Sequence, residues 1–199
     1  MIPRKNWRKN LNRPSKLEVW AASRPDATFY DLWDENINPV WSICLAVAGG
    51  APRKQLTLAA CAVARLCLHL VPEREARPRV AIETAEAWVR GKATAEQVSR
   101  AVDAAYAARA VNSAANAAYA AYNAANAAFD AAAHSSFAAA TAASAIYTYN
   151  AATSAVYYTL RAGIENSAVL STIRKHLVFE RPPKPKGLTV WQRLAMEET

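Results

Sequence analysis

The spacing of apolar and polar positions along the chain predicts a series of helices. A short apolar segment at 41–47 precedes Gly49 and Gly50, which are typical of a helix end. A second segment, from about 52 to 71, precedes Pro72 and has an apolar face too broad for a surface helix. Its apolar positions are Leu56, Leu58, Ala59, Ala62, Val63, Leu66, Leu68 and Leu70. We expect this second helix to be central to the core.

The next predicted helix has both a start signal and a stop signal. Pro78 suits a first helical position, and Gly91 suits the left-handed position after a last turn. Two pairs inside it have the four-residue spacing of ion pairs, namely Arg79 with Glu83 and Glu86 with Arg90. Glu83 and Glu86 could also act as a general acid and base, or supply half of a metal site. The chain has no Glu-x-x-His element to complete a di-metal site, so we favour the ion pairs.

Residues 101–161 form an alanine-rich tract without glycine or proline. Alanine is the best helix former, and Thr94 with Gln97 has the spacing of a capping box that would open this helix. An unbroken helix of about 60 residues would be about 90 Å long, whereas a compact domain of this size has a radius of gyration of about 16 Å. We therefore expect an antiparallel helical hairpin, with its turn near His134, Ser135 and Ser136.

The tract divides into two faces if it is helical from residue 109 to residue 130. One face, the asparagine stripe, is polar and continues from Arg109 to Asp130; its members are Asn112, Asn116, Tyr119, Asn123 and Asn126. The other face, the alanine seam, consists of Ala107, Ala110, Ala114, Ala117, Ala121, Ala124 and Ala128. We expect the alanine seam to pack against a neighbouring helix. The asparagine stripe is then either a solvated face or a surface that contacts a partner.

Larger side chains return after the predicted turn. The segments 146–149 and 156–160 have strand-like propensity, but the alanines around them favour helix over a hairpin through Asn150. Gly163 marks the end of this element, and residues 165–176 read as a closing helix with basic residues at its C-terminal end.

Charge is concentrated near the two ends of the chain. The net charge is +8, and the first 16 residues contain six basic side chains and no acidic one. Such an arm attracts nucleic acid, an anionic membrane surface or an acidic protein. Its aromatic residues can stack on bases or fold back onto their own domain. The candidate nucleic-acid contacts are Arg4, Lys5, Trp7, Arg8 and Lys9. We divide the chain into this arm at 1–38, a helical domain at 39–178 and a proline-linked tail at 179–199, which would be a strap or a docking motif.

The remaining reactive side chains do not form a recognisable site. Cys44, Cys61 and Cys67 lie in apolar surroundings and read as reduced core residues. The three histidines are isolated from one another in the sequence. We expect no catalytic centre, metal or cofactor, no apolar run that spans a membrane, and no secretion signal. These features indicate a cytoplasmic protein.

Two stretches resemble an alanine-rich family of bacterial and phage proteins that are usually labelled uncharacterised or putative immunity proteins. They are Leu-Thr-Leu-Ala-Ala-Cys at 56–61 with its continuation to residue 75, and Arg-Pro-Arg-Val-Ala-Ile-Glu-Thr-Ala-Glu-Ala-Trp-Val-Arg-Gly at 77–91. The resemblance covers about residues 41–178. It implies an all-helical protein without a catalytic centre that neutralises a toxin or another protein by binding it.

Together these observations predict an all-α helical bundle with a long alanine-rich antiparallel hairpin and extended N- and C-terminal tails. The favoured function is a non-catalytic protein-binding module, immunity-like or inhibitory, with the asparagine stripe as its contact surface. One alternative is a nucleic-acid-associated protein that binds through its basic arm. Another is a structural subunit of a phage particle or other assembly, in which copies of the chain associate.

Overall fold

The computed structural model describes residues 6–11, 16–109, 120–125, 141–179 and 181, and these residues form helices joined by loops and turns, without strands. In chain order the helices are η1 (Trp7–Asn10), α1 (Lys16–Ala22), α2 (Phe29–Glu35), α3 (Pro39–Ala48), α4 (Arg53–Arg65), η2 (Leu68–Leu70), α5 (Arg77–Val89), α6 (Ala95–Arg109), α8 (Thr141–Arg161) and α9 (Asn166–His176). Residues 120–125 are also helical. The all-α prediction is confirmed for this part of the chain.

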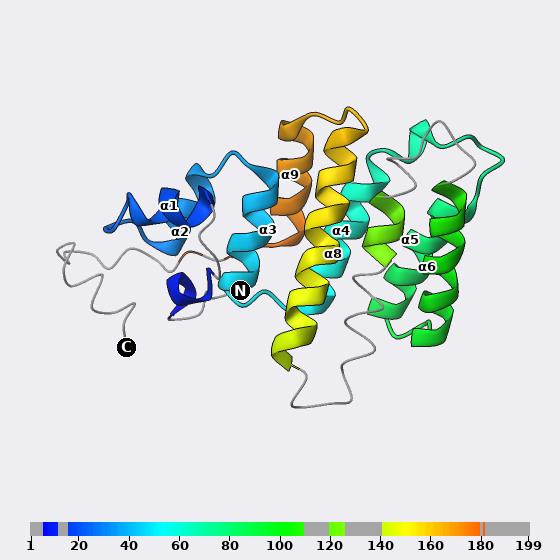
Figure 1. Ribbon diagram of the computed structural model, residues 1–199, viewed down its shortest axis with the longest axis horizontal. Helices are drawn as coiled ribbons and strands as arrows, with labels where there is room; N and C mark the ends of the chain where they lie inside the picture. The colour runs from blue at the N-terminus through cyan, green and yellow to red at the C-terminus, as the bar shows by residue number, and fades with distance from the viewer. Residues whose placement is uncertain (1–5, 12–15, 110–119, 126–140, 180, 182–199) are drawn as a thin grey trace.

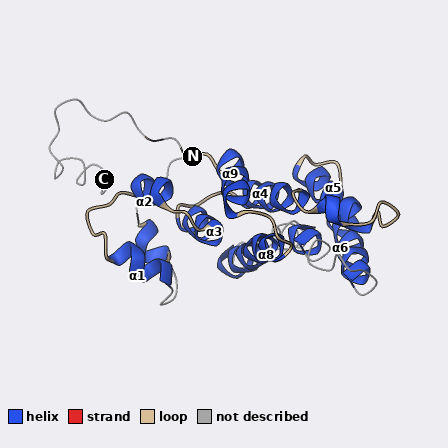
Figure 2. Ribbon diagram, turned by 90° about the horizontal axis from the view of Figure 1, so that it is seen from above, coloured by secondary structure: helices blue, strands red, loops and turns tan. Residues whose placement is uncertain are grey.

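The helices form an elongated row, with α1 and α2 at one end and α5 and α6 at the other (Figures 1 and 2). Between the two ends, α4 packs against α5, α8 and α9, and α3 packs against α8 and α9. The central position expected for the second helix is therefore confirmed. Small buried side chains on α8, among them Ala152 and Ala155, allow the close approach of α4.

Local signals placed several helix ends correctly. Pro78 lies in the first turn of α5, and Gly91 follows that helix with a φ of 73°, a conformation that side chains with a Cβ rarely adopt. The Thr94–Gln97 capping box opens α6: the Thr94 amide donates to Gln97 Oε1 at 2.8 Å, and the Gln97 amide donates to Thr94 Oγ1 at 3.3 Å. Segments 146–149 and 156–160 lie within α8, so the preference for helix is confirmed.

The second helix is shorter than predicted. It ends at Arg65 instead of continuing to residue 71, and η2 follows it. The amides of Leu66 and Cys67 bond to carbonyls three residues earlier, at Val63 and Ala64, so the backbone tightens into a 3-10 turn at this point.

The alanine-rich tract is bent before the turn that we predicted near Ser135. The rings of Tyr106 and Tyr122 have centroids 5.2 Å apart. In a straight helix, 16 residues would separate their backbones by about 24 Å. The helix that holds Tyr106 therefore does not continue straight to Tyr122. Residues 134–136, where the hairpin turn was predicted, lie outside the described ranges.

The predicted alanine seam is only partly correct. Ala121 and Ala124 are buried, but Ala107 is exposed. On α6 the buried face instead consists of Val98, Ala101, Val102, Ala105 and Ala108. The two valines bring more apolar surface to the packing against α5 than any alanine, so they determine which face of α6 is buried. The other seam positions lie outside the described residues.

Candidate binding surfaces

The described N-terminal residues pack onto the domain as an N-terminal unit made of η1, α1 and α2. Trp7, a candidate nucleic-acid contact, is 7% exposed and belongs to the same buried cluster as α3, α4 and α9. Its ring meets Phe29 edge to face at 5.4 Å. The aromatic residues of this segment therefore fold back onto their own domain, which was one of the two roles that the sequence left open.

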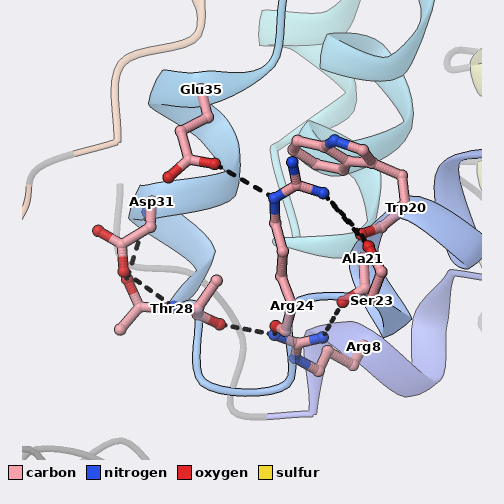
Figure 3. Close-up of polar contacts among 9 residues, drawn as sticks. Arg8, Trp20, Ala21, Ser23, Arg24, Thr28, Asp31 and Glu35 are labelled. Carbon is pink, nitrogen blue, oxygen red and sulfur yellow. Dashed lines mark hydrogen bonds and ion pairs between the residues drawn. The ribbon is translucent and has the colours of Figure 1, made fainter.

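Arg8 fixes the turn between α1 and α2 (Figure 3). Its Nη1 donates to the carbonyl of Ala21 at 2.9 Å, and its Nη2 donates to the carbonyls of Arg24 at 2.9 Å and Ala27 at 2.6 Å. Ala21 lies in the last turn of α1, where carbonyls favour a nearby cation, and Arg24 and Ala27 lie in the turn that follows. The guanidinium of Arg8 is thus engaged within the N-terminal unit. Arg4 and Lys5 lie outside the described residues, and Lys9 is described only as part of η1.

Two further arginines attach the C-terminal part of the domain to α2. Arg174 of α9 donates through Nη2 to the carbonyls of Trp33, Asp34 and Asn36, each at 2.9 Å. Arg181 pairs with Asp31 and Asp34, each at 3.0 Å. These contacts connect residues almost 150 positions apart in the sequence.

Phe179 packs against aromatic rings of α2, the helix that Arg181 also contacts. Its ring lies 4.7 Å from Phe29 and 4.9 Å from Trp33, centroid to centroid. A Cβ atom at Gly49 would lie 2.8 Å from two ring carbons of Phe29, so glycine is required there by the close approach of the ring. Residues 179 and 181, part of the predicted tail, therefore pack as a strap over α2.

The carboxyl group of Asp31, in the first turn of α2, is stabilised in its ionised form. Thr28 and Asp31 form a reciprocal capping box, shown in Figure 3. Burial of the Asp31 carboxyl opposes ionisation, but the hydrogen bonds from Thr28 and the guanidinium of Arg181 outweigh it. The pKa of Asp31 is therefore below its ordinary value.

The three thiols are free, as predicted. Cys61 and Cys67 are buried, and burial raises the pKa of Cys67 to about 11 and that of Cys61 still further. Cys44 is half-buried, its Sγ lies 3.1 Å from the hydroxyl of Tyr149, and burial raises its pKa too. A thiol must lose its proton to be a good nucleophile, so these groups are suited to packing.

One described member of the asparagine stripe is not on the surface. Asn123 is 8% exposed, and the alanines next to it are buried as well. The stripe was derived by assuming one continuous helix across residues 109–130, and the bend between Tyr106 and Tyr122 removes that register. Asn123 is thus buried in the structure, and its role in partner contact stays a prediction. Asn112, Asn116, Tyr119 and Asn126 lie outside the described residues.

The two acidic residues of α5 have different surroundings. Glu86 accepts two hydrogen bonds from Arg65, at 2.8 Å from Nε and 2.9 Å from Nη2, and its predicted partner Arg90 lies at 3.9 Å. Glu83 forms no ion pair with Arg79 in the described part of the chain. It lines a groove instead.

This groove lies between α5 and α6, and we did not predict it from the sequence. It has a volume of about 570 Å³. Helix α5 contributes Val80, Glu83, Thr84 and Ala87; the connecting loop contributes Lys92 and Ala93; helix α6 contributes Gln97, Arg100, Ala101 and Ala104. On each helix the lining positions recur every three or four residues, so each helix presents one full stripe to the groove. Most of the lining side chains are short, and Val80 at 48% is among the most exposed apolar side chains.

The described residues include no cluster of histidine, cysteine, aspartate or glutamate that could hold a metal ion. Within the same ranges, no helix combines the length and the hydropathy needed to span a bilayer. Comparisons with protein-family models, curated proteins and solved structures found no match to this chain. The resemblance to putative immunity proteins therefore stays a prediction.

Proposed function

We propose that the chain is a non-catalytic protein-binding module whose contact surface is the α5–α6 groove. The observation that carries the proposal is the pair of helical stripes that face this groove. A partner helix, or a pair of helices, could place its apolar face along such a groove and meet a contact on every turn. The short side chains of Ala87, Ala101 and Ala104 would allow the partner backbone to approach closely.

The charged residues at the groove would provide specificity. Glu83, Lys92 and Arg100 line the groove and are exposed to solvent, and such charges contribute more to the choice of partner than to affinity. If the chain is immunity-like, as its resemblance implies, it would block the activity of its partner protein by covering part of that partner's surface.

Co-purification with a groove variant tests this function. We would compare the wild-type chain with Ala104→Gln, which places a longer side chain in the groove, by quantitative mass spectrometry of the proteins that co-purify. Ala168→Gln, on the exposed face of α9, is the matched control. A second copy of the chain that carries a different tag would be expressed in the same cells, and its co-purification would count as binding of a partner.

We expect at least one partner to be lost about tenfold or more from Ala104→Gln and retained by Ala168→Gln. Since a groove position half-covered by its neighbours can accept a glutamine without disturbing the core, helicity should be the same in all three proteins. Identical partner sets for the wild type and Ala104→Gln would refute the proposed function.

A further inference from the structure

The α5–α6 groove has charges of opposite sign at nearly the same height on its two walls. Glu83 lies six residues before the end of α5 at Val89, and Arg100 lies five residues after the start of α6 at Ala95. At about 1.5 Å per residue, these charges lie about 9 Å and about 7.5 Å from the ends that face the connecting loop. Among the described residues, neither side chain forms an ion pair.

A two-fold axis along the groove would make these charges complementary to themselves. The helices α5 and α6 pack side by side and are joined by a short loop, so they run antiparallel. Rotation of a second copy by 180° about such an axis places its α5 over α6 of the first copy, and its α6 over α5. Glu83 of each copy then faces Arg100 of the other at matching height. Such a contact, made by the same surface on both subunits, is the isologous interface of two-fold homodimers.

The rest of the groove is compatible with this arrangement. The short side chains of Thr84, Ala87, Ala101 and Ala104 are among those that line the groove, where two helix pairs would have to interdigitate. Val80 would lose contact with water in such a complex. The outcome would be four helices packed around a shared seam.

We propose that the α5–α6 groove is a homodimer interface, in which Glu83 of each copy pairs with Arg100 of the other. This inference rests on the proposed function, because it names a second copy of this chain as the protein that the groove binds. The effect of Lys92 on binding would distinguish a second copy of this chain from an acidic helix of another protein. In the dimer the two Lys92 side chains lie at the same end of the axis and repel, whereas an acidic helix would pair with Lys92.

Sedimentation equilibrium of the full chain tests the interface by exchanging its charges. The variants are Glu83→Arg, Arg100→Glu and the double variant. Each single reversal places like charges opposite each other at two symmetric positions, so we expect the dimer to weaken by about tenfold to hundredfold. The double variant restores opposite charges and should recover dimerisation to within about threefold of the wild type.

Matched controls separate this effect from a change in net charge. Arg79→Glu alters an exposed residue on α5 outside the groove by the same charge as Arg100→Glu. Glu73→Arg alters an exposed residue in the turn before α5 by the same charge as Glu83→Arg. Both controls should dimerise like the wild type. Lys92→Gln should strengthen the dimer or leave it unchanged. Circular dichroism would check that every variant keeps its helicity.

Three results would overturn the dimer. The first is a wild type that is monomeric at every concentration up to about 100 μM, a range in which specific dimers are normally seen. The second is a dimer that the single reversals do not weaken, and the third is a double variant that fails to recover. The proposed function would survive these results if Ala104→Gln still lost another partner protein, so the two failures can be told apart.

Discussion

Replacing Arg8 with lysine should loosen the N-terminal unit without changing the centre of the domain. The guanidinium forms three short hydrogen bonds to carbonyls, at 2.6–2.9 Å, and a longer one to the Pro25 carbonyl at 3.5 Å. A lysine ammonium on a flexible stem could keep about one of the three short bonds. A hydrogen bond from a charged donor contributes about 1.5–3 kcal/mol when buried. Since Arg8 is only half-buried, about 1 kcal/mol for each lost bond is reasonable, which gives about 2 kcal/mol.

This free energy predicts a local change in hydrogen exchange. A loss of about 2 kcal/mol raises the population of the opened N-terminal unit about 30-fold. Mass spectrometry of exchanged peptides should therefore show protection falling by about that factor in α1 and α2. Protection in α4, at the centre of the fold, should be unchanged.

Arg24→Lys is the matched control. Arg24 pairs with Glu35 at 3.4 Å, donates to the Trp20 carbonyl at 3.3 Å and lies over the Trp20 ring, with 39% of its side chain exposed. A lysine there keeps the positive charge of this partly exposed ion pair, so the expected loss is below about 1 kcal/mol. If Arg8→Lys changes exchange in α1 and α2 no more than Arg24→Lys does, the structural role assigned to Arg8 is wrong. Equal loosening of α4 would show that the N-terminal unit does not open separately.

Three further predictions concern the core and its titratable groups. Gly49→Ala should lower the free energy of unfolding in urea by about 1–3 kcal/mol, because the new methyl group collides with the Phe29 ring; an unchanged midpoint would show that the ring can move aside at little cost. Asp31→Asn should be less stable than the wild type at neutral pH. Because folding lowers the pKa of Asp31, the ionised carboxylate stabilises the folded protein fully above about pH 4, and this stabilisation is lost as the pH falls further. The melting temperatures of the wild type and Asp31→Asn should therefore converge in acid and stay different in base. Cys61 and Cys67 should resist iodoacetamide at about pH 8 until the protein unfolds, so the intact mass of the folded protein should show at most one adduct, at the half-buried Cys44. Rapid addition of two or three adducts to the folded protein would contradict the burial and raised pKa of Cys61 and Cys67.

The features that could be predicted from the sequence are those that depend on neighbouring residues. Pro78, Gly91 and the Thr94–Gln97 pair act within a single turn, and each marks a helix end as expected. The broad apolar face of α4 likewise predicted its central position, because only a helix surrounded by others can bury such a face.

The binding surfaces could not be predicted because they depend on contacts between distant segments. The carbonyls that Arg8 binds lie 13 to 19 residues away, and no local pattern indicates this arrangement. An alanine-rich tract has few large side chains to specify which face packs, so the register assumed for Asn123 did not survive the bend at Tyr106 and Tyr122. The groove exists only because α5 and α6 lie side by side.

The positions that line the groove did carry a signal in the sequence. Val80, Thr84 and Ala87 recur at helical spacing on α5, and Gln97, Ala101 and Ala104 do so on α6. Within α5 alone, the charged residues have the four-residue spacing of ion pairs, so the sequence favours contacts within that helix over contacts with a neighbouring one. Glu83 and Arg100 come to the same height only when α5 and α6 are aligned as an antiparallel pair.

Alanine-methyl NMR tests the role of the α5–α6 groove most directly. Spectra of the protein labelled at its alanine methyl groups would be recorded over a range of protein concentrations and with each co-purifying partner added. We predict that the signals of Ala87, Ala101 and Ala104 shift, while those of Ala22 and Ala168, which are exposed on α1 and α9, stay fixed. Groove signals that do not move at any concentration or with any partner would contradict the assignment of this surface to protein binding.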